Sequence, residues 1–442
     1  MMPRNPFAIA GGGILLIWPA LANGYPLLFS DTGSFMEQLL LPTMIWDKPW
    51  IYGPVLVVVS LKLTLWLPVL AQGGLTSWVL WRVEGSFRAP SPIGHLGLCL
   101  VLALGSAAPW FASLLMPDIL APLTVLLLFL LAFDTNQRWR VTLMMLATFA
   151  IAAHLAHLLI AAACLVPVLV LRPRAIMRAA APLAAAVVLL LTTNLIGFGR
   201  VGLSPYGAVF GLARLVADGP AKTWLDENCP DASYRMCGWK GRLPTDANVF
   251  LWDPAGPVWT WPGGPIPLAP EASRIVAATI MSHPWVVARA ALSNWIAQLI
   301  TLRLDNVIGG EWLDATVGAQ LHDHYPAVEV DRFQASAQRR DDLRAIAAPW
   351  QSAYIVLLGL GAISSSILLI RSRRHDPLLF ALIAEIAIGC ISNAFATGVL
   401  SGPHDRYQAR IAWLVLLPPA IYAMQYLSVC PETNDTIKRR WF

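Results

Sequence analysis

Apolar and polar positions alternate on a long scale in this chain, with runs of about 20 or more apolar residues separated by short polar intervals. A helix of that length crosses the hydrocarbon core of a bilayer, which is about 30 Å thick. The pattern predicts an all-α polytopic membrane protein with about ten transmembrane helices. The predicted spans are residues 7–29, 64–83, two within 93–134, two short ones within 141–171, 179–198, 349–370, 377–400 and 411–429.

Two apolar runs have lengths that do not fit one crossing. Residues 51–83 would form a helix of about 50 Å, and a lysine in mid-span costs roughly 3 kcal/mol on insertion, so we expect a break at Lys62 with a surface helix before it. Residues 141–171 supply about 46 Å of helix between two arginine clusters, which favours two short or re-entrant helices. Their turn falls near His154 and His157, where irregular backbone requires a sheltered polar site.

Arginine and lysine gather in six short clusters, each of which abuts an apolar run. The clusters are Arg4, Arg82 to Arg88, Arg138 with Arg140, Arg172 to Arg178, Arg371 to Arg374, and Lys438 to Arg440. Cationic side chains stay on the cytoplasmic side during insertion, so all six clusters are expected on one face, with both termini cytoplasmic. The run at 7–29 lacks a cleavage site of small residues, which favours an anchor over a removed signal peptide.

Residues 199–349 contain no convincing span and are rich in Pro, Gly, Trp, Asp and Asn. This interval is expected to form a mixed or mostly helical extracytoplasmic domain, in which 271–304 suits helices lying at the membrane interface. Cys229 and Cys237 are predicted to form a disulfide bond there, because that compartment is oxidising. The predicted units are an N-terminal transmembrane module at 1–198 with a first outward loop at 24–63, the extracytoplasmic domain at 199–349, and C-terminal transmembrane helices at 350–442.

Composition agrees with a membrane protein and narrows the partners. Of 442 residues, 57% are hydrophobic and 13% are charged, and the mean hydropathy is +0.60. The net charge of +5 is largely that of the arginines beside the apolar runs, which favours contact with anionic lipid headgroups and no nucleic-acid partner. Arginine outnumbers lysine and alanine is abundant, as in GC-rich bacteria, so we expect a bacterial plasma membrane, with the endoplasmic reticulum as the alternative. Nothing in the sequence demands more than a monomer.

Polar residues gather on three segments that this topology places outside the membrane. They are the first loop with Asp31, Glu37, Trp46, Asp47 and Lys48, the turn at 108–118 that ends in Pro117-Asp118, and the loop Ser401-Gly-Pro-His-Asp-Arg-Tyr-Gln-Ala-Arg410. In this order, the segments resemble the GT-C superfamily of integral-membrane glycosyltransferases, such as those dependent on dolichyl-phosphate-mannose. The resemblance covers residues 1–200, together with the Arg406-Tyr407 pair before the last span.

The resemblance implies that the protein transfers a sugar from a polyprenyl-phosphate donor to a glycan, lipid or protein acceptor at the extracytoplasmic face. Asp31 matches the family's first-loop acid and would be the general base, with Asp118 and Glu37 as further catalytic candidates. The residues expected to bind the donor phosphate are His404, Arg406, Tyr407 and Arg410. The residues expected to line the substrate cavity are His154, His157, Trp46, Asp47 and Lys48.

The chain departs from the family at one point. Many members carry a second acid beside the first, whereas Thr32 follows Asp31 here. Glu37, Asp47 or Asp118 would have to substitute for it, which weakens the case for a divalent cation, and no metal ligand is assigned. The tryptophans that suit sugar stacking are Trp46, Trp50 and Trp261.

The candidate residues also have structural explanations. Ser34 to Glu37 reads as a capping box, so Asp31 would simply favour the dipole at the start of a surface helix. Asp118 after a proline suits a helix start, and Arg406 and Arg410 would anchor a helix at the headgroups.

Intramembrane polar residues suggest a second class of function. Glu385 lies within a predicted span and is expected to have a buried partner such as Asn393, and His154 and His157 share a helix face at a spacing that suits either a metal or a packed turn. A transporter or lipid flippase would use this acid and the histidine turn as a pathway, although no internal repeat is seen. A non-catalytic scaffold that binds a partner through the outward domain is the third alternative.

Overall fold

The computed structural model describes residues 5–230 and 233–427, and all of its regular elements in these ranges are helices. The N-terminal helices are α1 (Pro6–Leu15), α2 (Trp18–Asn23), α3 (Ser30–Leu40), α4 (Tyr52–Ser60), α5 (Trp66–Phe87), α6 (Pro92–Gly105), α7 (Ala108–Ser113), α8 (Leu120–Phe133), α9 (Arg140–Ala152), α10 (Leu155–Leu171) and α11 (Ile176–Phe198). The middle helices are α12 (Ala208–Asp218), α13 (Pro220–Asn228), α14 (Ala247–Trp252), α15 (Pro265–Ser282), α16 (Pro284–Ile300), α17 (Asp305–Ile308), α18 (Ala319–His324) and α19 (Ala327–Gln334). The last helices are α20 (Leu343–His375), α21 (Pro377–Leu400), α22 (Asp405–Ala412) and α23 (Leu417–Leu427).

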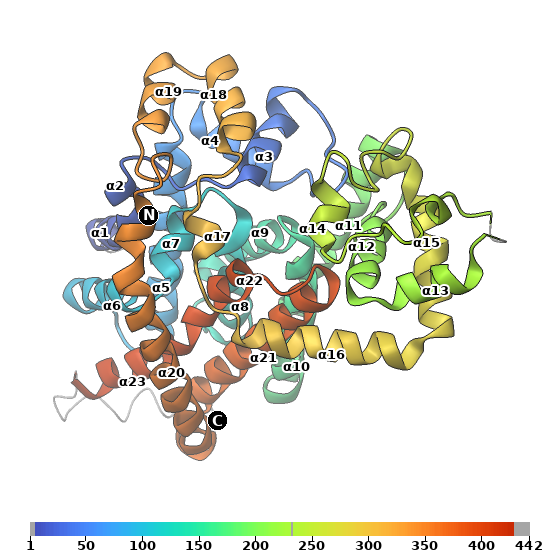
Figure 1. Ribbon diagram of the computed structural model, residues 1–442. Coiled ribbons are helices and arrows are strands. Elements are labelled where there is room, and N and C mark those ends of the chain that lie inside the picture. Colours follow the sequence, from blue (N-terminus) through green and yellow to red (C-terminus); the bar gives the residue numbers. More distant parts are fainter. Residues whose placement is uncertain (1–4, 231–232, 428–442) are drawn as a thin grey trace.

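Short turns of other helix types join several of these helices. They are η1 (Pro117–Ile119), η2 (Gln137–Trp139), η3 (Pro173–Ala175), η4 (Arg235–Trp239), the π-helical η5 (Asp314–Gly318) and η6 (Trp413–Leu416). Figure 1 shows α12 to α15 gathered at one side of the molecule, and α18 and α19 beyond α3 and α4 at its top.

Three of the described helices are long and apolar enough to cross a membrane, and they are Pro173–Phe198, Leu343–His375 and Pro377–Leu400. The pair α15 and α16 passes the same test when taken together, but is bent by 102° at its break. Five further apolar helical segments among the described residues have 10–17 residues. The all-helical fold is therefore as predicted and is compatible with a membrane protein, whereas the number of crossings and the side of each terminus stay predictions.

Two predicted breaks in the apolar runs are confirmed. α4 ends at Ser60 and α5 begins at Trp66, and the intervening Leu61 and Lys62 have positive φ angles of 55° and 54°, which stop a helix. The second break separates α9 from α10 at His154, whose Nδ1 accepts a hydrogen bond of 3.2 Å from the backbone N–H of Ala156 and so caps α10.

The predicted first span, 7–29, is built from two short helices rather than one. Pro19 lies in the first turn of α2 and has no N–H to continue the hydrogen-bond ladder of α1, so the chain breaks after Leu15. Gly24 ends α2 with a φ of 76°, a conformation that glycine adopts without strain. The chain then runs extended beside the turn before η1, where Leu27 N–H donates to Ser113 O at 3.0 Å.

The buried residues form two large cores. The main core packs α1 to α11 with α20 to α23, and it also includes residues from α17 to α19. Tyr25 donates a hydrogen bond of 2.9 Å to Glu329 of α19, which ties the first outward loop to this late segment. The second core lies between α12, α13, α14 and α15, and the disulfide bond between Cys229 and Cys237, the pair selected from the sequence, closes a loop at its edge.

Arginines from distant clusters meet at the carboxyl end of α8. Arg82 forms an ion pair with Asp134, which follows α8 directly. Arg172 Nη1 donates to the carbonyl oxygen of Ala132 at 3.1 Å, and Arg178 Nη2 donates to the same oxygen at 2.8 Å. Three clusters that the sequence places on one face are therefore close together, since Arg138 and Arg140 follow Asp134 within six residues. The clusters at Arg4 and at Lys438 to Arg440, and residues 428–429 of the last predicted span, lie outside the described residues.

Candidate functional site

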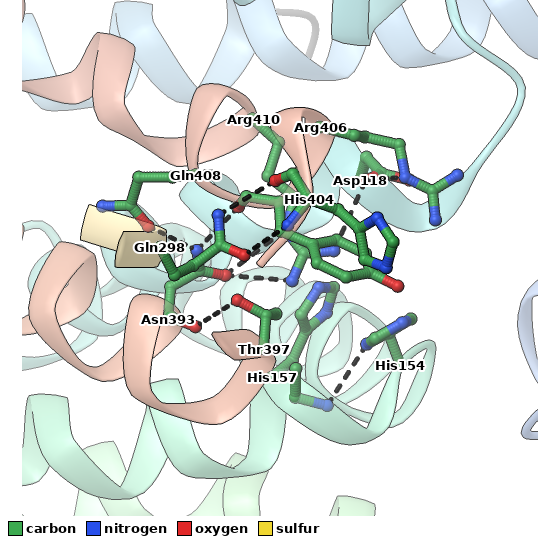
Figure 2. Close-up of polar contacts among 12 residues, drawn as sticks. Asp118, His154, His157, Gln298, Asn393, Thr397, His404, Arg406, Gln408 and Arg410 are labelled. Carbon is green, nitrogen blue, oxygen red and sulfur yellow. Dashed lines mark hydrogen bonds and ion pairs between the residues drawn. The ribbon is translucent and has the colours of Figure 1, made fainter. Parts of the chain in front are cut away.

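The candidate site begins with a buried carboxylate beside two arginines, at the opposite end of α8 from the arginine clusters. Asp118 in η1 lies 3.5 Å from Arg406 Nε and 3.4 Å from Arg410 Nη1 (Figure 2). The Asp118 and Arg410 side chains are only 2% and 1% exposed, so their charges are compensated within the protein. Burial lowers the pKa of Arg406, but the charges of Asp118, Tyr407 and Asp31 together outweigh this effect and hold the pKa above its ordinary value.

Amide side chains from two long helices hold α22 in place. Asn393 of α21 accepts hydrogen bonds from Arg410 Nη2 at 2.9 Å and Nε at 3.3 Å, and its own N–H group donates to Gln408 at 2.9 Å (Figure 2). Gln298 of α16 makes two hydrogen bonds of 2.9 Å with the backbone N–H and C=O of His404. The side chains that follow Gly402 are therefore fixed by both α16 and α21.

The Arg406 guanidinium lies against aromatic rings and retains an unused donor. Its Cζ is 4.1 Å from the centre of the Phe29 ring and 5.3 Å from that of Tyr407. Arg406 Nη1 is buried and has no hydrogen-bond partner among the described residues. Tyr407 also packs edge-on against His404, and burial lowers the pKa of His404, with Arg406 adding to this effect. An anionic ligand would satisfy the free N–H of Arg406.

Asp31 lies in the first turn of α3 and forms an ion pair with Lys48. Lys48 Nζ is 3.3 Å from the Asp31 carboxylate and 2.6 Å from that of Asp47. Burial lowers the pKa of Lys48, but the two carboxylates together raise it by a larger amount, so the pKa of Lys48 lies above its ordinary value. The Asp31 side chain is 33% exposed, and its charge also acts on Arg406. The first-loop acid and Arg406 are therefore neighbours electrostatically.

The start of α3 differs from the capping-box interpretation. The helix begins at Ser30, so Ser34 is already inside it and cannot be its cap. The N–H of Phe29 instead donates to Thr32 Oγ1 at 3.0 Å, and the Thr32 hydroxyl donates to Leu115 O at 3.1 Å. This places Asp31 at the positive end of the helix dipole, as the structural explanation expected.

Glu37 and Trp46 lie at the edges of this region. Glu37 accepts a hydrogen bond of 3.3 Å from Gln320, and burial raises its pKa, an effect that Lys48 partly offsets. Trp46 stacks on Phe210 at 5.2 Å between ring centres and so packs against the second core. The other two tryptophans considered for sugar stacking are also engaged, since Trp50 Nε1 donates to Gln38 O at 2.9 Å and Trp261 lies under Arg235.

His154 and His157 lie at the α9–α10 turn, below the cluster of Asp118, Arg406 and Arg410 in the view of Figure 2. Their ring centres are 5.2 Å apart, and Arg410 is an electrostatic neighbour of both. His157 Nδ1 contacts the carbonyl oxygen of Ala150 at 2.6 Å, and its Nε2 is buried without a partner among the described residues. Within the described ranges, no group of three or more His, Cys, Asp or Glu side chains is arranged to hold a metal ion.

The expected pairing of Glu385 with Asn393 is wrong. Asn393 uses its amide for α22, as described above, and both carboxylate oxygens of Glu385 are buried without a hydrogen-bond partner among the described residues. The two residues are eight positions apart on one helix, too far for their side chains to meet. The sequence interpretation also overlooked Gln298, Asn393 and Gln408 as supports of the site. Their signal was present, since amides in apolar helices require partners.

The structure thus brings together Asp118, Arg406 and Arg410 in one cluster and Asp31, Asp47 and Lys48 in a second. Comparisons with protein-family models, with curated proteins and with solved structures find no match to this chain. The resemblance to GT-C glycosyltransferases therefore rests on the residues themselves.

Proposed function

We propose that the protein is a polytopic membrane glycosyltransferase of GT-C type, which transfers a sugar from a polyprenyl-phosphate donor to an acceptor hydroxyl. Asp31 takes the proton from the acceptor, whose oxygen attacks the anomeric carbon of the donor. The bond between that carbon and the phosphate oxygen breaks, and the phosphate leaves on its carrier lipid. Arg406 stabilises the charge that develops on the leaving phosphate.

The observation that carries this proposal is the environment of Arg406. Its guanidinium faces the carboxylate of Asp118, and the charge of Asp31 also acts on it. Its Nη1 is buried without a hydrogen-bond acceptor among the described residues. Arg410 is already engaged with Asp118 and Asn393. Its main role on this proposal is to position the cluster, and Arg406 is the arginine that binds the phosphate. A base and a phosphate-binding cation are the two groups that glycosyl transfer from a phosphate donor needs.

The predicted topology is consistent with a site at the extracytoplasmic face. α8 has 14 residues, which corresponds to about 21 Å of helix, and it separates Asp118 at one end from Asp134 and the arginine clusters at the other. Because arginine clusters stay in the cytoplasm, the Asp118 end faces outward. On this proposal the chain crosses a bacterial plasma membrane ten times and has both termini in the cytoplasm. The second core with its disulfide bond then lies on the extracytoplasmic side.

The substitution Asp31→Asn tests the proposal. Lys48 keeps its shorter contact to Asp47, so the variant should fold, and transfer of labelled sugar in proteoliposomes should fall about 100- to 10,000-fold while donor binding persists. The matched control Asp331→Asn removes an exposed carboxylate from α19 and should leave transfer unchanged. A second variant, Arg406→Lys, should weaken donor binding, because lysine lacks the fork that holds two phosphate oxygens. Full transfer by Asp31→Asn would refute the assignment.

Glu385 favours a transporter as the second candidate. Its carboxylate oxygens have no hydrogen-bond partner in the part of the chain that the structure describes, and an acid of this kind within a membrane is costly and often belongs to a proton or ion pathway. On that reading, Glu385→Gln abolishes coupled uptake of a solute into proteoliposomes, whereas Asp31→Asn does not. The glycosyltransferase proposal requires the reverse order of severity.

A further inference from the structure

A cavity of about 470 Å³ lies at the junction of α10 and α11, away from the candidate site. It is lined by Leu171, Arg172, Pro173, Arg174, Ala175 and Arg178. Half of these residues carry a guanidinium, and none carries a carboxylate. Arg140 is a further electrostatic neighbour of Arg178, so positive charge extends beyond the lining itself.

The acid whose charge acts on Arg178 is engaged elsewhere. Asp134 acts on Arg178 through its charge, but its carboxylate forms the ion pair with Arg82. Arg172 Nη1 and Arg178 Nη2 are oriented by the carbonyl oxygens at the end of α8, at 3.1 Å and 2.8 Å from Ala132 O. In the case of Arg178, the carbonyl group fixes the direction of the guanidinium but carries no net charge to balance it, so this side of the cavity attracts an anion.

One donor in the cavity also requires an acceptor. Arg178 Nε is buried and has no hydrogen-bond partner among the described residues. Arg174, in contrast, is exposed at the cavity rim, where it is able to close over a ligand. An oriented arginine with a free N–H, next to a second exposed arginine, suits the several oxygens of a phosphate group.

The place of the cavity indicates which phosphate is available to it. It lies at the amino end of the candidate span Pro173–Phe198, and the other side of its rim is the apolar end of α10 at Leu171. At the end of a span, a basic pocket between helices is at the depth of lipid headgroups. Exposed apolar side chains such as Val170 and Met177 adjoin it and suit contact with acyl chains.

We propose that this cavity binds the phosphate of an anionic phospholipid headgroup. The lipid holds the α10–α11 junction against the end of α8 by adding an anionic partner for Arg174 and Arg178. The assignment is independent of the glycosyltransferase proposal, because it involves the opposite end of α8 and none of the residues around Asp118.

Native mass spectrometry of the full chain in detergent tests this assignment, with phosphatidylglycerol and phosphatidylcholine of the same acyl chains as probes. Phosphatidylglycerol should bind at least about five-fold tighter, and Arg174→Gln should remove about five-fold, since each arginine near the surface contributes about 1 kcal/mol to the attraction. Arg174 is exposed, so this variant should fold normally; adding Arg178→Gln should remove the preference altogether. The control Arg373→Gln deletes an exposed arginine at the end of α20, outside the cavity, and should bind like the parent chain.

Two results would overturn the assignment. Equal binding of the two lipids, or equal losses in Arg174→Gln and Arg373→Gln, would show that the cavity does not select an anionic headgroup. An arm with excess inorganic phosphate separates lipid from free phosphate. Phosphatidylglycerol that stays bound supports the headgroup, whereas complete displacement that depends on Arg174 would assign the cavity to free phosphate instead.

Discussion

The substitution Asp118→Asn is expected to destabilise the protein by about 3 kcal/mol or more. It removes one negative charge from a site in which the Asp118 and Arg410 side chains are almost completely buried. Loss of one partner of a buried ion pair typically costs about 3–5 kcal/mol, because the remaining charge stays away from water. The distances of 3.4 Å and 3.5 Å are long for hydrogen bonds, and the asparagine oxygen still accepts weakly, so the lower part of this range applies.

Reversible unfolding of the detergent-solubilised protein in denaturant measures this cost. Asp323→Asn is the control, since this carboxylate is 66% exposed and its loss should change the free energy of unfolding by less than about 0.5 kcal/mol. The double variant Asp118→Asn with Arg410→Gln should lose less than the sum of the single variants, because it also removes a cation that the first change leaves unpaired. A loss below about 1 kcal/mol in Asp118→Asn, or strict additivity in the double variant, would refute the view that this carboxylate compensates buried arginines.

Three further predictions address other parts of the molecule. In Gly12→Val, the new Cβ would lie 2.6 Å from Ser77 Oγ and 2.8 Å from Cys99 Sγ, so the free energy of unfolding should fall by about 1–3 kcal/mol, whereas Gly74→Ala, which meets nothing within 4 Å, should change it little. Burial lowers the pKa of His404, so the unfolded chain takes up the proton first, and stability is lost as the pH falls below about 6.5 toward the folded-state pKa. Unfolding measured at several pH values should therefore show a flatter dependence of stability on pH in His404→Gln. An unchanged slope would contradict this prediction. Replacing Cys229 and Cys237 by serine should cost about 2.5 kcal/mol on the chain-entropy model, and the parent protein treated with reductant should show the same loss in thermal unfolding.

The breaks in the apolar runs could be predicted because they depend on local costs. Lys62 is costly at mid-span because of its charge. The run at 141–171 has arginines at both ends, which require an even number of crossings, but it supplies only about 46 Å of helix. The structure breaks the helices at these two points, with Leu61 in a left-handed conformation and His154 as a helix cap.

The partners of buried polar groups could not be predicted in the same way. Asp118 and Arg410 are 292 positions apart, and their contact depends on how α22 docks against α21. Asn393 was assigned to Glu385 because both lie on one helix, whereas its amide serves the next helix along the chain. Likewise, the stacking of Trp46 on Phe210 joins the first loop to the second core, and no local pattern indicates it. Long-range docking decides each of these contacts.

The two charged regions at the ends of α8 differ in how their arginines are compensated, and this difference bears on function. At the carboxyl end, Arg178 donates to a backbone carbonyl, and its buried Nε has no hydrogen-bond partner among the described residues, so this group is available to a ligand. At the other end, Arg410 is matched by Asp118 and held by Asn393, which is the arrangement of a preorganised site whose charges must not move. Arg406 belongs to this second region, and its Nη1 is buried without a hydrogen-bond partner among the described residues. Within this region, a ligand that carries negative charge therefore gains most at Arg406, where the charge of Asp31 also acts.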